Sequence, residues 1–317
     1  MRVFVTGGAG YIGSHCAARL IEAGHSVVVF DNLSTGRREL VRESADFIRG
    51  DLTSPEEIEG ALENTRPDIV MHFAAKCIIP ESIAKPIYYW EQNVTGTINL
   101  LRGMEKTGTD KIIFSSTVAV YGDPADIPIT EKTPVAPISP YGTTKQAAEN
   151  AIIDSALTGK IKYMILRYFN VGGSGYDIQC RAENETRLIP LALKAADGEI
   201  PVLQVFGGDY PTRDGSCVRD FIHVLDIADA HMAAMDYLDR ADSSEIVNLG
   251  TNEGFTVLEI ANMTREITQT NFPIEIVDRR EGDTPVVIAS RDKAEALLKW
   301  RPRRDLREII ASSRQED

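Results

Sequence analysis

The sequence has little positive charge, and no part of it is both long and apolar. Its 317 residues include 34 Lys and Arg against 47 Asp and Glu, which gives a formal net charge of −13. This charge repels a phosphate backbone, so we expect no nucleic-acid partner. No apolar run approaches the roughly 20 residues of a membrane span, so we expect no membrane partner either. An anionic ligand would need local devices such as helix N-termini and a few arginines.

Cysteine and histidine are also scarce. The four cysteines are Cys16, Cys77, Cys180 and Cys217, which are widely separated and form no C-x-x-C pair. This pattern is typical of reduced thiols rather than of a disulfide framework. Together with a strand pattern that begins at Arg2, with no signal peptide before it, the pattern predicts a cytoplasmic protein. The five histidines show no ligand spacing, so we expect no metal site.

Hydrophobic and charged residues, at 43% and 26%, are ordinary for a globular protein. In the first half, apolar β-rich runs alternate with segments of helical length, which predicts βαβ crossovers and a parallel sheet covered on both faces. The expected fold class is therefore α/β, a doubly wound (Rossmann) sheet. We expect strands at Val3–Thr6, Ser26–Phe30, Asp46–Arg49, Ile69–His72, Lys111–Ser115 and Lys162–Leu166, and helices at Ile12–Glu22, Pro55–Asn64, Ile87–Lys106 and Tyr141–Leu157.

Beyond residue 168 this regularity ends. Asn170–Asn184 and Gly207–Gly215 are rich in glycine and polar residues, and we expect them to form loops. We predict a first domain over residues 1–168 and a smaller, mixed α/β C-terminal domain over residues 169–317. The segment 219–240 is expected to return to the first domain.

Three glycines follow the first strand and open the first helix. Gly7, Gly10 and Gly13 have the spacing G-x-x-G-x-x-G, which lets the backbone approach a pyrophosphate while the N–H groups at the helix start face its oxygens. Asp31 ends the second strand, where a carboxylate would accept hydrogen bonds from an adenosine ribose and repel a 2′-phosphate. These features predict a dinucleotide site over residues 1–168 that prefers NAD to NADP.

The segment Asp51–Leu52 follows the third strand, near the expected adenosine. Asp51 could hydrogen-bond an adenine edge, or it could be a turn or helix-capping aspartate. The sequence leaves both alternatives open.

Tyr141 is followed four residues later by Lys145, and Ser139 and Pro140 precede it as N-cap and first helical residue. The pair therefore lies one turn apart on one helix face. A free tyrosine has a pKa of about 10, and an ammonium together with a positive nicotinamide ring would favour its phenolate. A shift of ~3 units needs ~4 kcal/mol of differential stabilisation. The phenolate could then take an alcohol proton while hydride leaves for NAD.

The fifth strand ends in Ser115-Ser116-Thr117. We expect the Thr117 hydroxyl to hydrogen-bond the reacting oxygen and to relay its proton. The alternative is that these three hydroxyls only cap turns, and it applies best to Ser115.

These residues and several further motifs closely resemble the UDP-glucose 4-epimerase family, a branch of the extended short-chain dehydrogenases. The resemblance extends over nearly the whole chain and implies tightly held NAD and a UDP-sugar that bridges the two domains. The further motifs are Asp31–Ser34, Val120–Gly122, Ser139–Gly142, Arg167–Asn170, Phe206–Thr212, Val218–Val224 and Arg279–Asp283.

The resemblance also implies roles for single residues on the cofactor side. Tyr11 and Ile12 would lie by the pyrophosphate, and Asn32 near the adenosine. Phe73 and Ala74 would line the cofactor cleft, supported by Asn93, and Lys145 would hold the nicotinamide ribose.

On the substrate side the resemblance implies that residues 169–317 bind the UDP-sugar. Asn170 would contact the nucleotide diphosphate or the sugar. Arg219 and Arg280 would clamp the diphosphate, a chemistry that suits two guanidinium groups in an acidic protein. For Arg219, a pair with Asp220 is an open alternative. The remaining implied contacts are Leu188 and Phe206 with the uracil, and Asp283 with the uridine ribose.

Some positions depart from the family pattern. Many relatives have lysine where this chain has Cys77, so the resemblance does not imply a lysine contact with the cofactor at this position. Thr117 replaces a serine and keeps the hydroxyl, and Arg187 replaces a smaller polar residue. Val287 falls where the family varies between tyrosine and smaller residues. Its medium size could admit a 2-N-acetyl group, which would make a UDP-N-acetylhexosamine a second substrate.

The resemblance implies reversible inversion at C4 of UDP-glucose and UDP-galactose through a 4-keto sugar. Epimerases of UDP-N-acetylhexosamines, UDP-pentoses or UDP-uronates are alternatives, as is a non-catalytic NAD-binding regulator, which would be expected to lack the Tyr–Lys pair. A 4,6-dehydratase would need an Asp-Glu pair where this chain has Val118-Ala119. The resemblance further implies a homodimer formed by the helices at 87–106 and 141–157. The apolar stripes of these helices could instead pack on their own sheet.

Overall fold

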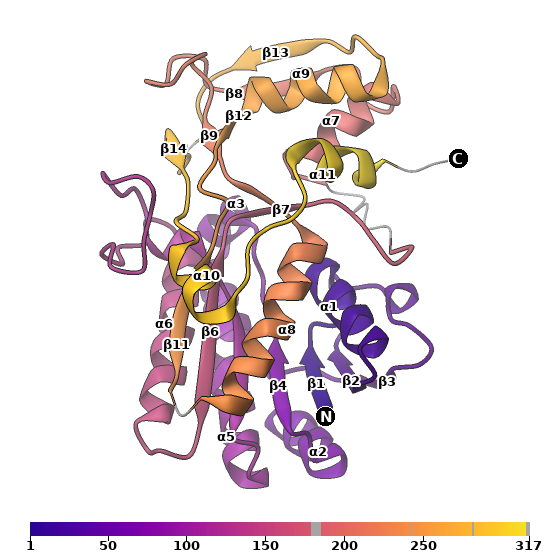
Figure 1. The fold of residues 1–317 in the computed structure, drawn as a ribbon, viewed down its shortest axis with the longest axis vertical. Helices are drawn as coiled ribbons and strands as arrows, with labels where there is room; N and C mark the ends of the chain where they lie inside the picture. The colour runs from indigo at the N-terminus through magenta and orange to yellow at the C-terminus, as the bar shows by residue number, and fades with distance from the viewer. Residues whose placement is uncertain (179–184, 242, 281, 315–317) are drawn as a thin grey trace.

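The computed structural model describes residues 1–178, 185–241, 243–280 and 282–314. Seven parallel strands form one sheet in the order β11-β6-β5-β4-β1-β2-β3, with helices on both faces (Figure 1). This arrangement confirms the predicted doubly wound α/β fold class. The strands are β1 (Arg2–Thr6), β2 (Ser26–Asp31), β3 (Asp46–Arg49), β4 (Ile69–His72), β5 (Lys111–Thr117), β6 (Lys162–Tyr168) and β11 (Glu245–Leu249).

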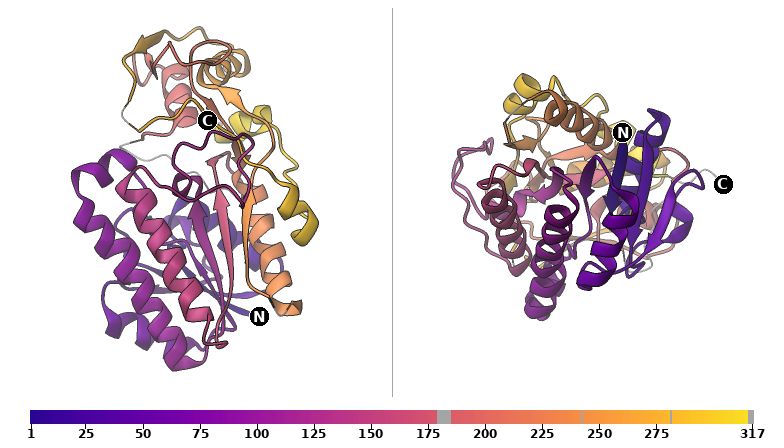
Figure 2. Two further views of the ribbon diagram at one scale, coloured as in Figure 1. Left: turned by 90° about the vertical axis from the view of Figure 1, so that its left-hand side faces the viewer. Right: turned by 90° about the horizontal axis from the view of Figure 1, so that it is seen from below.

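The two faces of this sheet bury separate hydrophobic clusters, because successive side chains of a strand point to opposite faces. Val3 and Val5 contribute to the cluster under α1 (Tyr11–Glu22) and α8 (Val224–Arg240), whereas Phe4 contributes to the other. That second cluster lies under α2 (Pro55–Thr65), α5 (Gly96–Thr107) and α6 (Pro140–Ala156). Figure 2 shows α5 and α6 on one side of the sheet and α8 on the other. Both faces are covered, so the carboxyl edge of the sheet is where its loops can form a site.

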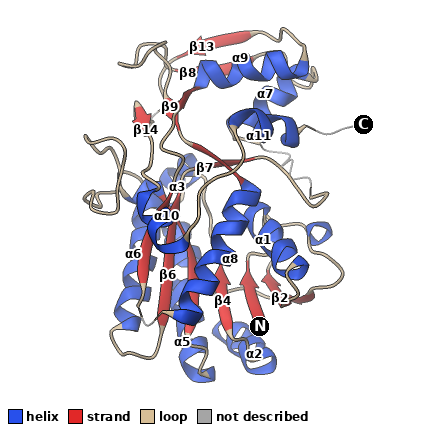
Figure 3. Cartoon of the chain, viewed as in Figure 1, coloured by secondary structure: helices blue, strands red, loops and turns tan. Residues whose placement is uncertain are grey.

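A smaller, mixed region lies beyond this carboxyl edge (Figure 3). Its core includes Ile189, Ile260 and Ile309, one from each of the helices α7 (Leu188–Ala196), α9 (Val257–Thr268) and α11 (Leu306–Ser313). Its short strands form three small sheets. These are β8 (Leu203–Phe206) with β13 (Ile274–Val277), β7 (Asn170–Gly172) with β10 (Phe221–His223), and β9 (Val218–Arg219) between β12 (Phe255–Thr256) and β14 (Val286–Val287).

Two elements differ from the sequence prediction. The seventh strand, β11, was not predicted, because its five residues follow a long helix and pair with β6 only in the folded chain. The helix predicted over 87–106 is divided into α4 (Pro86–Tyr89), a π-helical turn η2 (Trp90–Thr95) and α5. Such turns are frequent at functional sites. The remaining elements are α3 (Ile79–Ala84), α10 (Asp292–Leu298) and the 3₁₀ turns η1 (Arg38–Leu40) and η3 (Val118–Val120).

Several predictions concern the loops, the cysteines and the membrane. The loop expected at Asn170–Asn184 begins with β7, and its residues 179–184, Cys180 included, lie outside the described residues. The other three cysteines are free thiols. In the part of the chain that the structure describes, no helix has the length and hydropathy of a membrane span.

Candidate active site

The three motif glycines form a turn between β1 and α1, and two of them, Gly7 and Gly13, have no room for a side chain. Gly7 has φ of +72°, and a Cβ there would lie 2.6 Å from the backbone nitrogen of Ala74. A Cβ at Gly13 would collide with the Gly7 carbonyl oxygen. Gly10 is the N-cap of α1, so the first turn of this twelve-residue helix has no side-chain cap on its N–H groups. These features fit the diphosphate of a dinucleotide, which binds to free backbone N–H groups at such a turn.

The Asp31 carboxylate is bonded to this turn. Its Oδ2 accepts from the backbone N–H of Ala9 at 3.0 Å, and its Oδ1 accepts from that of Leu33 at 2.8 Å. Asp31 is buried at the carboxyl end of β2. It therefore joins the glycine turn to the loop in which we expect the adenosine ribose.

Asp51 and Asn32 face each other at the neighbouring strand ends. The Asn32 amide donates to Asp51 Oδ2 at 2.8 Å, and Asp51 Oδ1 accepts from the Thr53 N–H at 2.8 Å, as a turn aspartate does. Burial acts to raise the pKa of Asp51, but the hydrogen bonds from Thr53 and Asn32, with the charge of Lys76, hold it below its usual value. Leu52 is buried, and its carbonyl accepts from the Asn99 side chain at 2.9 Å. The structure thus has the turn geometry, while a contact with adenine stays a prediction.

The other predicted cofactor residues lie around the same carboxyl edge. Phe73 and Ala74 follow β4, and the Phe73 ring packs 4.7 Å from that of His231. Ile12 packs against the hydrophobic cluster under α1. The buried Asn93, in the π-helical turn, hydrogen-bonds the backbone of the loop after Ala74. Tyr11 donates its hydroxyl to the Gly173 carbonyl at 2.5 Å, and the Arg187 guanidinium lies 4.7 Å from its ring centroid.

Tyr141 and Thr117 meet where helix α6 begins beside the end of β5. Ser139 caps the helix by accepting from the Gly142 N–H at 3.2 Å, and Pro140 is its first residue. A Cβ at Gly142 would lie 2.5 Å from the Ala119 carbonyl oxygen, so the helix start packs directly on the turn after Thr117. Thr117 accepts from the Ala119 N–H at 3.1 Å, and its hydroxyl is close enough to Tyr141 to lower the pKa of that phenol. Thr117 therefore caps a turn and contacts the proposed base.

Burial dominates the electrostatics of the Tyr–Lys pair. It raises the pKa of Tyr141 above its ordinary value, the nearby Cys77 adds to this, and the hydrogen bond from Thr117 opposes it. Burial lowers the pKa of Lys145 to about 8, while Glu149 and Cys77 act to raise it. The Lys145 ammonium donates to the Ser115 carbonyl at 2.5 Å and lies 4.1 Å from the Phe114 ring centroid. Lys145 thus remains mostly charged at pH 7.

A buried ion pair lies one turn further along α6, and it was not predicted from the sequence. Arg167 binds Glu149 through Nε at 2.9 Å and through Nη2 at 2.5 Å, with 5% and 2% of the side chains exposed. Glu149 also accepts a hydrogen bond from Ser116, beside Thr117. The sequence could have indicated Glu149 by its position alone, because it follows Lys145 by four residues and therefore lies on the same helix face.

The predicted diphosphate ligands come together in the smaller region. Asp283 Oδ1 is 3.4 Å from Arg219 Nη2 and 3.1 Å from Arg280 Nη2. The Arg280 guanidinium lies 5.2 Å from the Phe206 ring centroid. The alternative ion pair of Arg219 with Asp220 is not formed. The Asp220 carboxylate instead accepts hydrogen bonds from Thr251 and Ala289. Of the other predicted substrate ligands, Asn170 is exposed at the start of β7 and Leu188 begins α7.

The comparisons with known proteins show the family of this chain. Residues 3–250 match the model of the NAD dependent epimerase/dehydratase family. This chain belongs to that family. NAD is accordingly its cofactor, and the predicted resemblance to UDP-glucose 4-epimerases is confirmed.

Individual relatives match over nearly their whole length. A UDP-glucose 4-epimerase of Rhizobium leguminosarum bv. trifolii is 43% identical over 98% of this chain and 95% of its own. The solved UDP-glucose 4-epimerase of Brucella ovis in complex with NAD is 41% identical, with a TM-score of 0.95 over 98% and 96% of the two chains. The UDP-Glc/GlcNAc 4-epimerase of Campylobacter jejuni is 37% identical, with a TM-score of 0.87 over 98% and 97%.

Proposed function

We propose that this enzyme interconverts UDP-glucose and UDP-galactose by reversible inversion at C4 of the sugar. The observation that supports this best is the contact of Tyr141 with the buried Thr117, beside Lys145 and at the same sheet edge as the glycine turn. A hydroxyl base at this edge lies next to the cofactor site, as oxidation of an alcohol requires.

The chain's own residues move and hold the proton. NAD held at the glycine turn would supply reversible oxidation at C4, with a transient 4-keto sugar. Tyr141 takes the 4-hydroxyl proton, partly through the Thr117 hydroxyl, and later returns it. Because burial raises the pKa of Tyr141 in the chain alone, its ionisation depends on nearby positive charge. Lys145, one helical turn away and charged below about pH 8, would supply part of that charge once substrate and cofactor are bound.

The two ends of the substrate are held differently in this proposal. Arg219 and Arg280 clamp the diphosphate, with Asp283 placed for the uridine ribose and Leu188 and Phe206 for the uracil. Asn170 reaches the diphosphate or the sugar. The hexose itself is held loosely, so that it can turn over and present its opposite face. Strong binding of both sugar faces would impede this turn.

The test is conversion of UDP-galactose to UDP-glucose by the purified protein, with UDP-glucose detected by a coupled enzyme. We expect Tyr141→Phe to lose about 10²- to 10⁴-fold in kcat, the usual contribution of a positioned proton donor or acceptor. Bound NAD should be unchanged in this variant, because the phenyl ring keeps the packing. Saturable NAD binding without turnover of any UDP-sugar would favour a non-catalytic regulator.

UDP-N-acetylhexosamines are a second candidate substrate class. Val287 pairs in register with Arg219 and packs against Tyr121 and Phe169, so a change in its size would alter the space beside the diphosphate ligands. The relative from Campylobacter jejuni is described as acting on both UDP-Glc and UDP-GlcNAc. A panel of UDP-hexoses, UDP-N-acetylhexosamines, UDP-pentoses and UDP-uronates, compared by kcat/KM, distinguishes these substrates.

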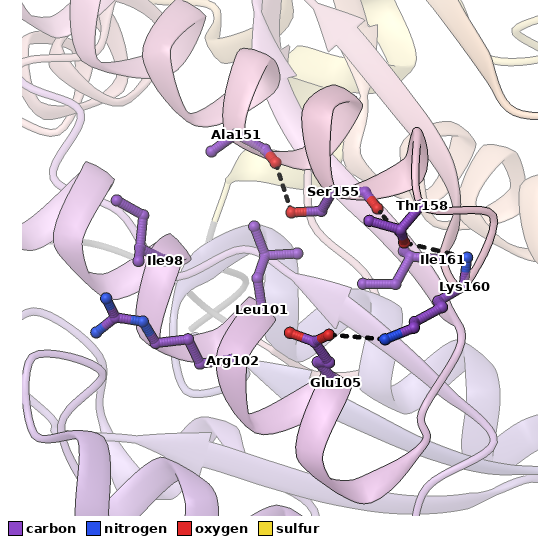
Figure 4. Close-up of a pocket in the computed structure, with 9 residues that line it drawn as sticks. All are labelled: Ile98, Leu101, Arg102, Glu105, Ala151, Ser155, Thr158, Lys160 and Ile161. Carbon is purple, nitrogen blue, oxygen red and sulfur yellow. Dashed lines mark hydrogen bonds and ion pairs between the residues drawn. The ribbon is translucent and has the colours of Figure 1, made fainter.

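The proposal has three further parts. They are a cytoplasmic location, a boundary between two domains at residue 168, and a homodimer. Between α5 and α6 a shallow pocket opens at Ala151, about 15 Å along the helix axis from Tyr141 (Figure 4). It is bordered by apolar side chains such as Ile98 and Leu101, and by the ion pair of Glu105 with Lys160 at 3.0 Å. Pairing of these helices with their copies would cover it. Sedimentation at micromolar concentration checks this, and a monomer would eliminate the dimer.

A further inference from the structure

The Lys76 side chain spans the end of β1, where the glycine turn begins. Lys76 lies in the loop after β4, and its ammonium donates to the Ser34 hydroxyl, in the loop after β2, at 2.9 Å. In the sheet, β1 lies between β4 and β2. A contact between the two outer loops must therefore pass the carboxyl end of β1, from which Gly7 begins the turn.

The backbone of Lys76 is rigidly placed. The buried Asn93 side chain accepts from its N–H at 2.8 Å and donates to its carbonyl at 3.0 Å. The same amide donates to Thr144, on α6, at 3.0 Å. The loop is thus fixed through main-chain atoms, and the side chain can be changed without removing these bonds.

The surroundings of the ammonium suit an additional anion. Its positive charge lowers the pKa of Asp51. Among the described residues, however, no carboxylate oxygen lies within 4.0 Å of the Lys76 Nζ, so the ammonium forms no ion pair. Its close contacts are the neutral Ser34 hydroxyl and the Tyr88 ring, 5.7 Å away. An ammonium forms its strongest hydrogen bonds with ionised oxygens, so a diphosphate on the glycine turn would be a better partner than a hydroxyl.

We propose that Lys76 binds the diphosphate of NAD and closes over it from the β4 side. Between β4 and α3, at residues 73–78, Lys76 is the one cationic side chain. The proposal depends on the NAD cofactor and not on which UDP-sugar is the substrate, so its test needs no sugar.

The test is retention of NAD by the purified holoenzyme, measured as NAD released per chain on denaturation and as the rate of exchange with excess labelled NAD. We expect Lys76→Gln to release NAD roughly 10- to 100-fold faster, equivalent to ~1.4–2.8 kcal/mol. Lys76→Arg should stay within about threefold of the original rate, because it keeps the charge. Added salt should accelerate release from the original enzyme more than from the glutamine variant.

Two control variants separate charge from local structure. Lys85→Gln removes a nearby lysine with 63% of its side chain exposed and should leave release unchanged. Ser34→Ala removes the present hydrogen bond but keeps the ammonium, and it should also retain NAD. Release from Lys76→Gln at the original rate, or equal acceleration in Ser34→Ala, would overturn the proposal.

Discussion

The cofactor side of this site and the side that is proposed to bind the UDP diphosphate, called the diphosphate side below, are built in opposite ways. On the cofactor side, apart from the proposed contact of Lys76, backbone and short side chains form the surface, as in the glycine turn with its Asp31 bonds to Ala9 and Leu33. On the diphosphate side, long side chains from two-residue strands and loops meet, as in the cluster of Arg219, Arg280 and Asp283. A preformed surface suits a cofactor that is regenerated in every cycle. Adjustable side chains suit a substrate that must enter, turn over and leave.

The largest effect should come from a methyl group added to the preformed surface. A Cβ at Gly13 would collide with the Gly7 carbonyl, so we expect Gly13→Ala to lose most bound NAD and with it most activity. NAD per chain, measured after denaturation, checks this expectation. Gly60→Ala is the matched control, because a Cβ there meets nothing within 4 Å and alanine favours the helix by about 0.5–1 kcal/mol. If both variants retained NAD, the comparison would fail.

A smaller effect is expected on the adjustable side. Arg280→Met removes one guanidinium from the cluster while 44% of that side chain is exposed, so the fold should persist. We expect KM for the UDP-sugar to rise roughly 10- to 100-fold, which corresponds to the free energy of one hydrogen bond to a charged group. The NAD content should be unchanged. Steady-state kinetics beside an NAD assay separates the two sides. Loss of NAD in this variant would show that the sides are not independent.

The pH dependence tests the junction between the two sides. Activity should fall as pH rises through about 8, because Lys145 then loses its proton. The Glu149 carboxylate acts to raise this pKa, so Glu149→Gln should move the alkaline limb of kcat toward lower pH by roughly one unit. His72 and Cys77 also face Lys145 and remain unchanged in the variant.

The control for this pH shift is Glu105→Gln, at an exposed carboxylate that pairs with Lys160. It should leave the pH profile where it is. An unmoved alkaline limb in Glu149→Gln would contradict the expected effect of this carboxylate on Lys145 and would leave its buried pair with Arg167 as a structural contact.

The smallest effect concerns the choice of sugar. Val287 is 8% exposed and packs with Tyr121 and Phe169, so Val287→Tyr narrows the space beside Arg219. We expect kcat/KM for UDP-N-acetylglucosamine to fall about tenfold, within the usual range for a change of size in a pocket, while that for UDP-glucose stays within about threefold. An equal fall for both sugars would remove Val287 as a determinant of specificity.

The cofactor side was more predictable from sequence than the diphosphate side. The glycine turn and the role of Asp31 depend on local backbone geometry, so residues that are close together in the sequence were enough to predict them. The meeting of Asp283 with Arg219 spans 64 positions and followed only from the resemblance to a family. The Glu149–Arg167 pair and the strand β11 depend on which strands become neighbours, and no local pattern records that. The π-helical turn at Asn93 could not be distinguished from the ordinary helical pattern of the residues around it.

The late strand β11 has a consequence for biosynthesis. It forms the outer border of the sheet beside β6, although it is made only after the whole of α8. Until residue 249 has left the ribosome, the N–H and C=O groups of β6 lack their final neighbour and can pair with another chain. A nascent or truncated chain ending at residue 240 would therefore be prone to aggregation, even though its glycine turn and Tyr–Lys pair are already complete.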